Sequence, residues 1–149
     1  MRTCIVYHSE HHGNTEKIAK SIAPVLGATL TASHQADPGS ILEAGLIGFG
    51  SGIYHGRFHQ NITGLVEQMP EQAGMPCFIF STTGSKRYSE RAHESFSALL
   101  SEKGFRIIGE FSCLGFDTAL SSEGINRGRP NEEDIRAAED FAGKLKSKI

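Results

Sequence analysis

The chain has 149 residues, a length typical of one domain, and we expect residues 1–149 to form a single domain. Fifteen Lys and Arg residues against 17 Asp and Glu residues give a formal charge of −2, which disfavours nucleic acid and anionic membranes as partners. No apolar run approaches the roughly 18 residues of a membrane span, and three cysteines without a CxxC pair indicate reduced thiols in a cytoplasmic protein.

Short apolar runs alternate along the chain with segments in which apolar residues recur at helical spacing. The runs predict strands at Thr3–Tyr7, Ala28–Ala32, Gly45–Phe49, Met75–Phe80 and Phe105–Leu114. The segments between them predict helices, as the spacing of Ala92, Phe96 and Leu100 illustrates. The alternation predicts an α/β fold, a doubly wound five-stranded parallel sheet with helices on both faces.

Prolines and capping residues predict where the helices begin and end. Pro24 lacks an N–H and crowds the preceding turn, so we expect the first helix to kink or end near Ala23. Ser40 is the expected cap of a short helical turn. Asn131 is the expected cap of the last helix, because three acidic residues follow it in the first turn.

The first loop of interest follows the first strand, at the sheet edge where such folds bind ligands. It reads Ser9-Glu10-His11-His12-Gly13-Asn14-Thr15 and leads directly into a helix. Unpaired N–H groups and the helix dipole bind anions at such a start. The loop has neither a GxxxxGK[ST] nor a GxGxxG pattern, so two interpretations remain, a phosphate site and a plain capped turn.

Two further loops follow predicted strands and are rich in Gly, Ser and Thr. The second reads Gly50-Ser51-Gly52-Ile53-Tyr54-His55-Gly56, and its glycines would let the backbone fold around a flat ligand. Tyr54 either lies against a planar heterocycle or covers the adjoining helix. The third, Ser81–Ser85, offers hydroxyl groups and a flexible glycine.

Together, the three loops resemble those of the flavodoxin family, and the resemblance covers nearly the whole chain. Gly13-Asn14-Thr15 match the end of the family's phosphate loop, and Tyr54 matches its ring-stacking aromatic residue. The resemblance implies a flavodoxin-like fold and bound FMN. The residues that it implies for binding FMN are Ser9, Glu10, His11, His12, Gly13, Asn14, Thr15, Ser51, Gly52, Ile53, Tyr54, His55, Gly56, Thr82, Thr83, Gly84 and Ser85.

Two features depart from the family pattern. Glu10, His11 and His12 replace residues that are often Ser or Thr, and a carboxylate facing a phosphate would be repelled. We therefore expect the Glu10 side chain to point away from the phosphate while its N–H binds. The near-neutral charge is the second departure, because many electron-carrying flavodoxins are strongly acidic.

The resemblance implies an electron carrier that shuttles electrons between cytoplasmic redox partner proteins, with no catalytic residue of its own. The alternative is a flavin-dependent oxidoreductase of the same fold. The stretch Ser51–His59 looks like the corresponding loop of flavodoxin-like protoporphyrinogen oxidases, although their extra segment in the last third is missing here. A quinone or flavin reductase is a related alternative. A CheY-like signalling domain needs an acidic cluster that Glu10 alone does not provide.

Several other polar residues are candidates for function. We expect no metal site, because His8, His11, His12, His55 and His59 form no HExxH motif. Cys4 and Cys77 are expected in the core, and Cys113 near the ligand edge, where it is either a packing residue or a redox thiol. The long stretch Gly115–Pro130 is expected on the ligand side, with Arg127 and Arg129 as candidate partner contacts.

Overall fold

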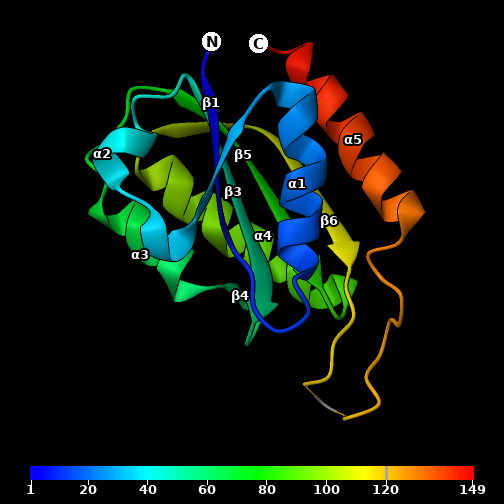
Figure 1. Ribbon diagram of the computed structural model, residues 1–149. Coiled ribbons are helices and arrows are strands. Elements are labelled where there is room, and N and C mark those ends of the chain that lie inside the picture. Colours follow the sequence, from blue (N-terminus) through cyan, green and yellow to red (C-terminus); the bar gives the residue numbers. More distant parts are fainter. Residues whose placement is uncertain (120) are drawn as a thin grey trace.

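Five apolar runs form five parallel strands in the computed structural model, which describes residues 1–119 and 121–149 (Figure 1). In chain order the elements are β1 (Thr3–His8), α1 (Asn14–Leu26), β2 (Thr29–Ala32), the 3₁₀ turn η1 (Ser33–Gln35), α2 (Pro38–Ile41), β3 (Leu46–Tyr54), β4 (Arg57–Phe58), α3 (Gln60–Gln68), β5 (Met75–Thr83), α4 (Lys86–Glu102), β6 (Phe105–Leu114) and α5 (Glu132–Lys146).

The parallel strands lie in the order β2-β1-β3-β5-β6, and the short β4 pairs antiparallel with β3. Val6 of β1 is in register with Thr31 on one side and with Phe49 on the other. The chain therefore winds outward from β1 to β2 and then returns to build the rest of the sheet on the opposite side. This reversal confirms the predicted doubly wound sheet, with β4 as an addition to it.

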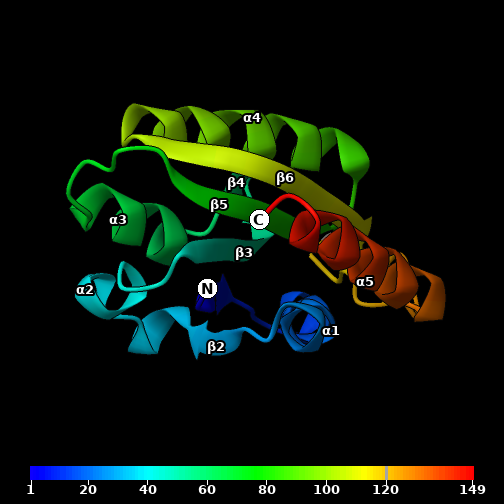
Figure 2. The ribbon, with the colours of Figure 1, turned by 90° about the horizontal axis from the view of Figure 1, so that it is seen from above.

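Helices cover both faces of the sheet, as Figure 2 shows. On the face of α1 and α5, Ile5, Phe78 and Phe80 form a buried cluster with Ala138 and other helical residues. On the face of α3 and α4, a second buried cluster includes Phe49, Phe96 and Phe105. Among the described helices, none combines the length and the apolar character needed to cross a membrane.

The second predicted loop is mostly strand, which corrects the expected boundaries. β3 continues to Tyr54 because its backbone pairs with both neighbours, Ser51 with His8 of β1 and with Ser81 of β5. The remaining turn consists of His55 and Gly56, whose φ angles of 53° and 75° are both positive. Two successive positive φ angles form a tight hairpin turn, which leads into β4.

The third predicted loop is shortened for the same reason. β5 runs to Thr83, because Thr82 and Thr83 pair with Cys113 and Leu114 of β6. Only Gly84 and Ser85 connect this strand to α4. The hydroxyl groups of Ser81, Thr82 and Thr83 therefore belong to the end of a strand.

The first helix does not end at Ala23, one predicted helix cap is wrong, and another is confirmed. α1 passes through Pro24 and ends at Leu26, because a missing N–H so near the helix end removes a single bond of its last turn. Asp37, rather than Ser40, caps α2, since its carboxylate accepts the Ser40 N–H at 3.0 Å. Asn131 caps α5 as predicted, in a reciprocal pair with Asp134.

Candidate functional site

The carboxyl ends of the strands surround a cavity of about 380 Å³, a size within the range of small-molecule sites. It lies at the sheet edge that the lower part of Figure 1 shows. Most of the residues predicted to bind a cofactor line it, namely Glu10, His11, His12, Asn14, Thr15, Gly52, Ile53, Tyr54, His55, Thr82, Thr83 and Gly84. The fold therefore brings the three predicted loops together around one space.

Five predicted residues lie beside the cavity without lining it, namely Ser9, Gly13, Ser51, Gly56 and Ser85. Ser51 is fully buried, and its hydroxyl group donates to the Gly52 carbonyl and accepts the His59 N–H. The Ser9 hydroxyl accepts the N–H of Glu16 in the first turn of α1. Both hydroxyl groups thus hold neighbouring backbone, which shapes the cavity wall.

The segment after β6 supplies the rest of the wall, through Gly115, Phe116, Asp117, Thr118 and Ala119. It lies on the ligand side, as its length and its place after the last strand predicted. The Asn14 side chain donates to the Phe116 carbonyl at 2.8 Å, and His12 Nε2 lies 3.1 Å from Thr118 Oγ1. Residue 120, within the same predicted stretch, lies outside the described residues.

The amino end of α1 opens onto the cavity. Gly13 precedes the helix with φ of 69° and has no side chain with which to cap it. The Asn14 side chain is engaged with Phe116, and the Thr15 hydroxyl group pairs with that of Thr82 at 2.7 Å. The N–H groups of Gly13 and Glu16 are bonded to the Glu10 carbonyl and the Ser9 hydroxyl group. Among the described residues, those of Asn14 and Thr15 have no partner and are therefore the donors that the helix start offers an anion.

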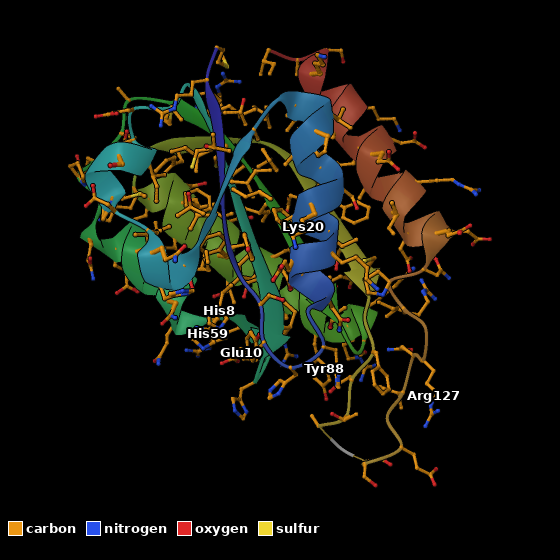
Figure 3. The ribbon with its side chains drawn as sticks, viewed as in Figure 1. His8, Glu10, Lys20, His59, Tyr88 and Arg127 are labelled. Carbon is orange, nitrogen blue, oxygen red and sulfur yellow. The ribbon has the colours of Figure 1, made fainter. Side chains whose placement is uncertain are left out.

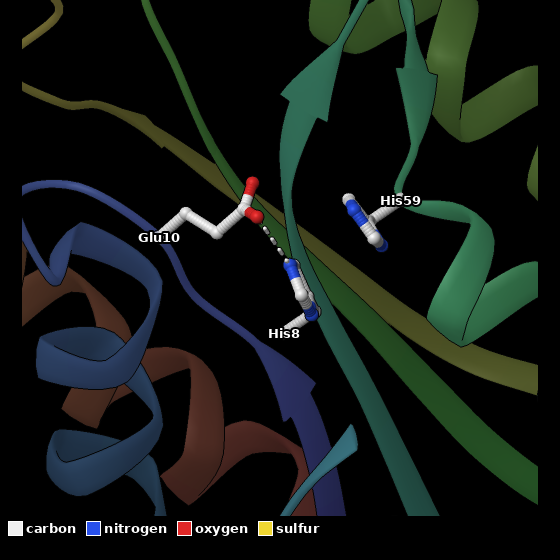
Figure 4. A group of neighbouring side chains, drawn as sticks. All are labelled: His8, Glu10 and His59. Carbon is white, nitrogen blue, oxygen red and sulfur yellow. Dashed lines mark ion pairs between the residues drawn. The ribbon is translucent and has the colours of Figure 1, made fainter. Parts of the chain in front are cut away.

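Glu10 turns its carboxylate away from α1 and toward two histidines, as Figures 3 and 4 show. His8 Nε2 lies 3.5 Å from Glu10 Oε1, and the rings of His8 and His59 stack with centroids 3.6 Å apart. Within the described part of the chain, these three side chains are the group whose geometry could hold a metal ion. The fold thus brings together two histidines, His8 and His59, that lie far apart in the sequence.

Tyr54 completes this corner of the cavity. Its half-buried ring meets the rings of His8 and His59 edge-on, with centroids 5.9 Å and 5.0 Å away. Burial, together with the negative charge of Glu10, raises the pKa of Tyr54 to about 12. The phenol is consequently a neutral hydrogen-bonding group at physiological pH.

A second cavity, of about 690 Å³, adjoins the first and shares Glu10, Tyr54 and His55 with it. Its apolar floor includes Phe58 and Phe96, whose rings stack with centroids 4.5 Å apart. Its other walls come from α3, α4 and the β3–β4 hairpin. The residues that α3 and α4 contribute to this second cavity form no sequence motif, so the sequence alone could not have identified them.

Two further candidates have structural roles. Arg129 binds Asp134 through Nε and Nη2, at 2.6 Å and 2.7 Å, so it is engaged at the start of α5 rather than free for a partner. Burial raises the pKa of the Cys113 thiol to about 12. Cys113 is buried in the cluster that contains Phe78 and Phe80, and the thiolate is the reactive form of cysteine, so Cys113 is a packing residue.

Comparisons with known proteins agree with this architecture. Residues 4–114 match the model of the Flavodoxin domain family. The chain is 41% identical over 145 residues to an uncharacterised protein of Methanocaldococcus jannaschii, covering 95% of this chain and 96% of the other.

Solved flavodoxins share the fold at low sequence identity. Flavodoxin 2 from Bacillus cereus is 22% identical and superposes with a TM-score of 0.76, with full coverage of both chains. The Fusobacterium nucleatum flavodoxin bound to flavin mononucleotide is 13% identical, with a TM-score of 0.71 over 100% of this chain and 99% of that one. Sheet order, loop positions and the family match lead to one conclusion: this chain belongs to the flavodoxin family.

Proposed function

We propose that the protein binds FMN in the cavity at the carboxyl edge of the sheet and carries electrons between cytoplasmic redox partners. The observation that carries the proposal is the convergence of the three predicted loops on one cavity beside the uncapped start of α1. Membership of the flavodoxin family and the fold shared with an FMN-bound flavodoxin support it.

The residues present fit such a cofactor. The positive end of the α1 dipole and the N–H groups of Asn14 and Thr15, which have no partner among the described residues, suit a phosphate dianion. The Glu10 carboxylate, which would repel that dianion, points toward His8 instead. Tyr54, the Gly52 backbone and the end of β5 line the part of the cavity in which a flat ring would lie.

Bound FMN would supply one- and two-electron redox chemistry, and the protein would supply orientation and environment. Tyr54, uncharged up to high pH, would add no negative charge beside the ring. The segment after β6, attached to α1 through Asn14, would limit the access of water from that side. These contacts support a carrier site, in which a cofactor edge would remain open to partner proteins.

The charge distribution indicates what kind of partner would dock. The whole chain carries a formal charge of −2, so no strong field directs encounters. Near the cavity, the exposed side chains of Lys86 and Arg87 begin α4, directly after the third loop. We therefore expect a partner with an acidic patch around its own redox centre.

The second cavity favours an alternative, a flavin-dependent oxidoreductase acting on a small molecule. Because it shares Glu10, Tyr54 and His55 with the first cavity, a substrate there would lie next to a bound flavin. Its apolar floor suits a planar organic molecule of the kind that quinone or flavin reductases use, or a tetrapyrrole as in protoporphyrinogen oxidases. Rapid turnover of such a substrate without a protein partner would favour this alternative.

The decisive test is reconstitution followed by stepwise reduction. The purified protein, incubated with FMN and then desalted, should be yellow and hold one FMN per chain. Anaerobic photoreduction of a carrier should proceed through a stable one-electron stage visible in the absorption spectrum. A protein that retains no FMN would refute the proposal, whereas direct two-electron reduction with rapid reoxidation by a small substrate would favour the enzyme.

A further inference from the structure

We propose that His8, Glu10 and His59 form a binding site for a divalent transition metal of the Zn²⁺ class. The three residues come from the end of β1, the loop after it and the residue that precedes α3. One ligand atom from each lies within 4.8 Å of the other two (Figure 4). Glu10 gives its side chain to this site, whereas its backbone belongs to the loop before α1, where we place the phosphate.

The distance between His8 and Glu10 fits a metal better than a direct bond. Nε2 of His8 and Oε1 of Glu10 are 3.5 Å apart, longer than a charged hydrogen bond. With metal–ligand distances of about 2.1 Å, two ligands of a tetrahedral Zn²⁺ ion lie about 3.4 Å from each other. The observed spacing is therefore close to an edge of that tetrahedron.

The surroundings of His8 leave its outer nitrogen available. Its Nδ1 lies 2.8 Å from Ser33 Oγ and 3.4 Å from the side-chain nitrogen of Asn61. When Nδ1–H donates in the shorter contact, to Ser33, the neutral ring keeps a lone pair on Nε2. Among the described residues, Nε2 is buried and has no hydrogen-bond partner. A buried ring nitrogen without a partner is costly. A metal ion would satisfy it, and Ser33 would act as the outer partner that orients a metal-bound histidine.

His59 completes the set after one movement of its ring. Its Nδ1 accepts the Asn61 N–H at 3.0 Å, so the neutral ring carries its proton on Nε2. In addition, rings stacked at 13° cannot aim their in-plane lone pairs at one point. Metal binding therefore requires His59 to leave the Asn61 N–H and tilt toward Glu10. That movement gives up one capping hydrogen bond and gains a metal bond.

The ligand set selects the class of ion. Two imidazole nitrogens and one carboxylate oxygen are the protein ligands of open Zn²⁺ sites, in which solvent takes the fourth position. Co²⁺ accepts the same ligands, whereas Mg²⁺ prefers oxygen ligands in octahedral geometry. Tyr54 and the second cavity lie next to the open side. A metal-bound solvent molecule would thus face the cavity.

The test measures metal binding to the full chain after removal of bound metal with a chelator. Calorimetry should find one Zn²⁺ per chain, Co²⁺ should give visible absorption, and Mg²⁺ should not compete. Ser33→Ala removes only an outer partner and should weaken Zn²⁺ binding about 10- to 100-fold. Glu10→Gln and His59→Ala each remove a direct ligand and should weaken it more than Ser33→Ala does. In nuclear magnetic resonance spectra, the signal of the Asn61 backbone amide should shift when the protein is saturated with Zn²⁺, because His59 no longer accepts its N–H.

His34→Ala is the matched control, because this exposed histidine follows Ser33 and lies outside the proposed ligand set. Its Zn²⁺ affinity should equal that of the parent protein. His8→Ala removes a partly buried ring and needs a check of its fold by circular dichroism. If it does not fold, the Glu10 and His59 variants decide. Wild-type affinity in either of them, or the lack of stoichiometric binding to the parent protein, would overturn the proposal.

Discussion

At the scale of single residues, Asp134 shows how one carboxylate stabilises the start of a helix. It accepts hydrogen bonds from Arg129 Nε and Nη2 and from the Asn131 N–H, and its own N–H donates to the Asn131 side chain. The hydrogen bonds with Arg129 hold the pKa of Asp134 below its ordinary value of 3.8. The ionised form is therefore the form that stabilises the fold.

The stability that Asp134 contributes depends on pH in a predictable direction. Because its pKa is lower in the folded protein than in the unfolded chain, the contribution is complete above the ordinary value and is lost as the pH falls through the folded value. We expect Asp134→Asn to lower the free energy of unfolding by about 1–2 kcal/mol at pH 7. This is the usual contribution of a hydrogen bond to a charged group, reduced because Arg129 is partly exposed to solvent. Urea unfolding of the variant and of the parent protein at a series of pH values measures this difference in the free energy of unfolding.

The difference between Asp134→Asn and the parent protein should shrink below pH 4, the range in which the parent carboxylate becomes protonated. Glu133→Gln is the control, since this exposed neighbour occupies the same helical turn. Its effect should be only about 0.3–1 kcal/mol, the value of a charge near a helix start. A pH-independent effect of Asp134→Asn would mean that packing, rather than charge, is what Asp134 contributes.

At the scale of elements, glycines in β3 allow the central strands to pack bulky aromatic residues. Gly48 and Gly50 are in register with Phe78 and Phe80 of β5. A Cβ atom at either glycine would overlap the ring of its partner. These rings are fully buried on the face covered by α1 and α5. The glycines thus have a packing role, besides the conformational one inferred for the loop that follows.

Gly50→Ala should therefore destabilise the protein by about 1–3 kcal/mol, the usual cost of overpacking a core. The matched control is Gly143→Ala in α5, where nothing lies within 4 Å of an added Cβ. Alanine there should raise the free energy of unfolding by about 0.5–1 kcal/mol, because glycine costs more chain entropy within a helix. Thermal or urea unfolding of both variants measures the two effects. Equal effects would contradict the packing role of Gly50.

At the scale of the whole molecule, local patterns in the sequence predicted the sheet and the three loops. Long-range contacts determine where the strands end and which side chains meet at the cavity. Apolar runs are local, so the strands and their order of appearance could be predicted. The extension of β3 to Tyr54 depends on pairing with β1 and β5, which no single segment reveals. Likewise, His8 and His59 are far apart in sequence and meet only because β1 lies beside β3, whose hairpin with β4 leads to His59. The segment around Phe116 has no motif, and its role depends on contact with Asn14.

The last prediction concerns how the assembled cavity would bind a flavin. If backbone N–H groups at the start of α1 hold the phosphate, FMN should bind more tightly than riboflavin, which lacks it. One or two charged hydrogen bonds, at about 1.5–3 kcal/mol each, correspond to a preference of at least tenfold. Fluorescence titration of the protein with each flavin measures the two dissociation constants.

Replacing Asn14 and Thr15 together by alanine tests how the cavity is built. Both side chains hold neighbouring walls, Asn14 at the Phe116 carbonyl and Thr15 at Thr82, while the N–H groups remain in the variant. The double variant should therefore bind both flavins markedly more weakly and keep its preference for FMN. Ser21→Ala, whose hydroxyl group bonds only within α1, should change neither affinity. Unchanged FMN affinity in the double variant would contradict this account of the cavity walls, and equal affinities of the parent protein for FMN and riboflavin would contradict the phosphate assignment. The first result would show that the walls do not depend on these contacts, and the second that the helix start does not bind the phosphate.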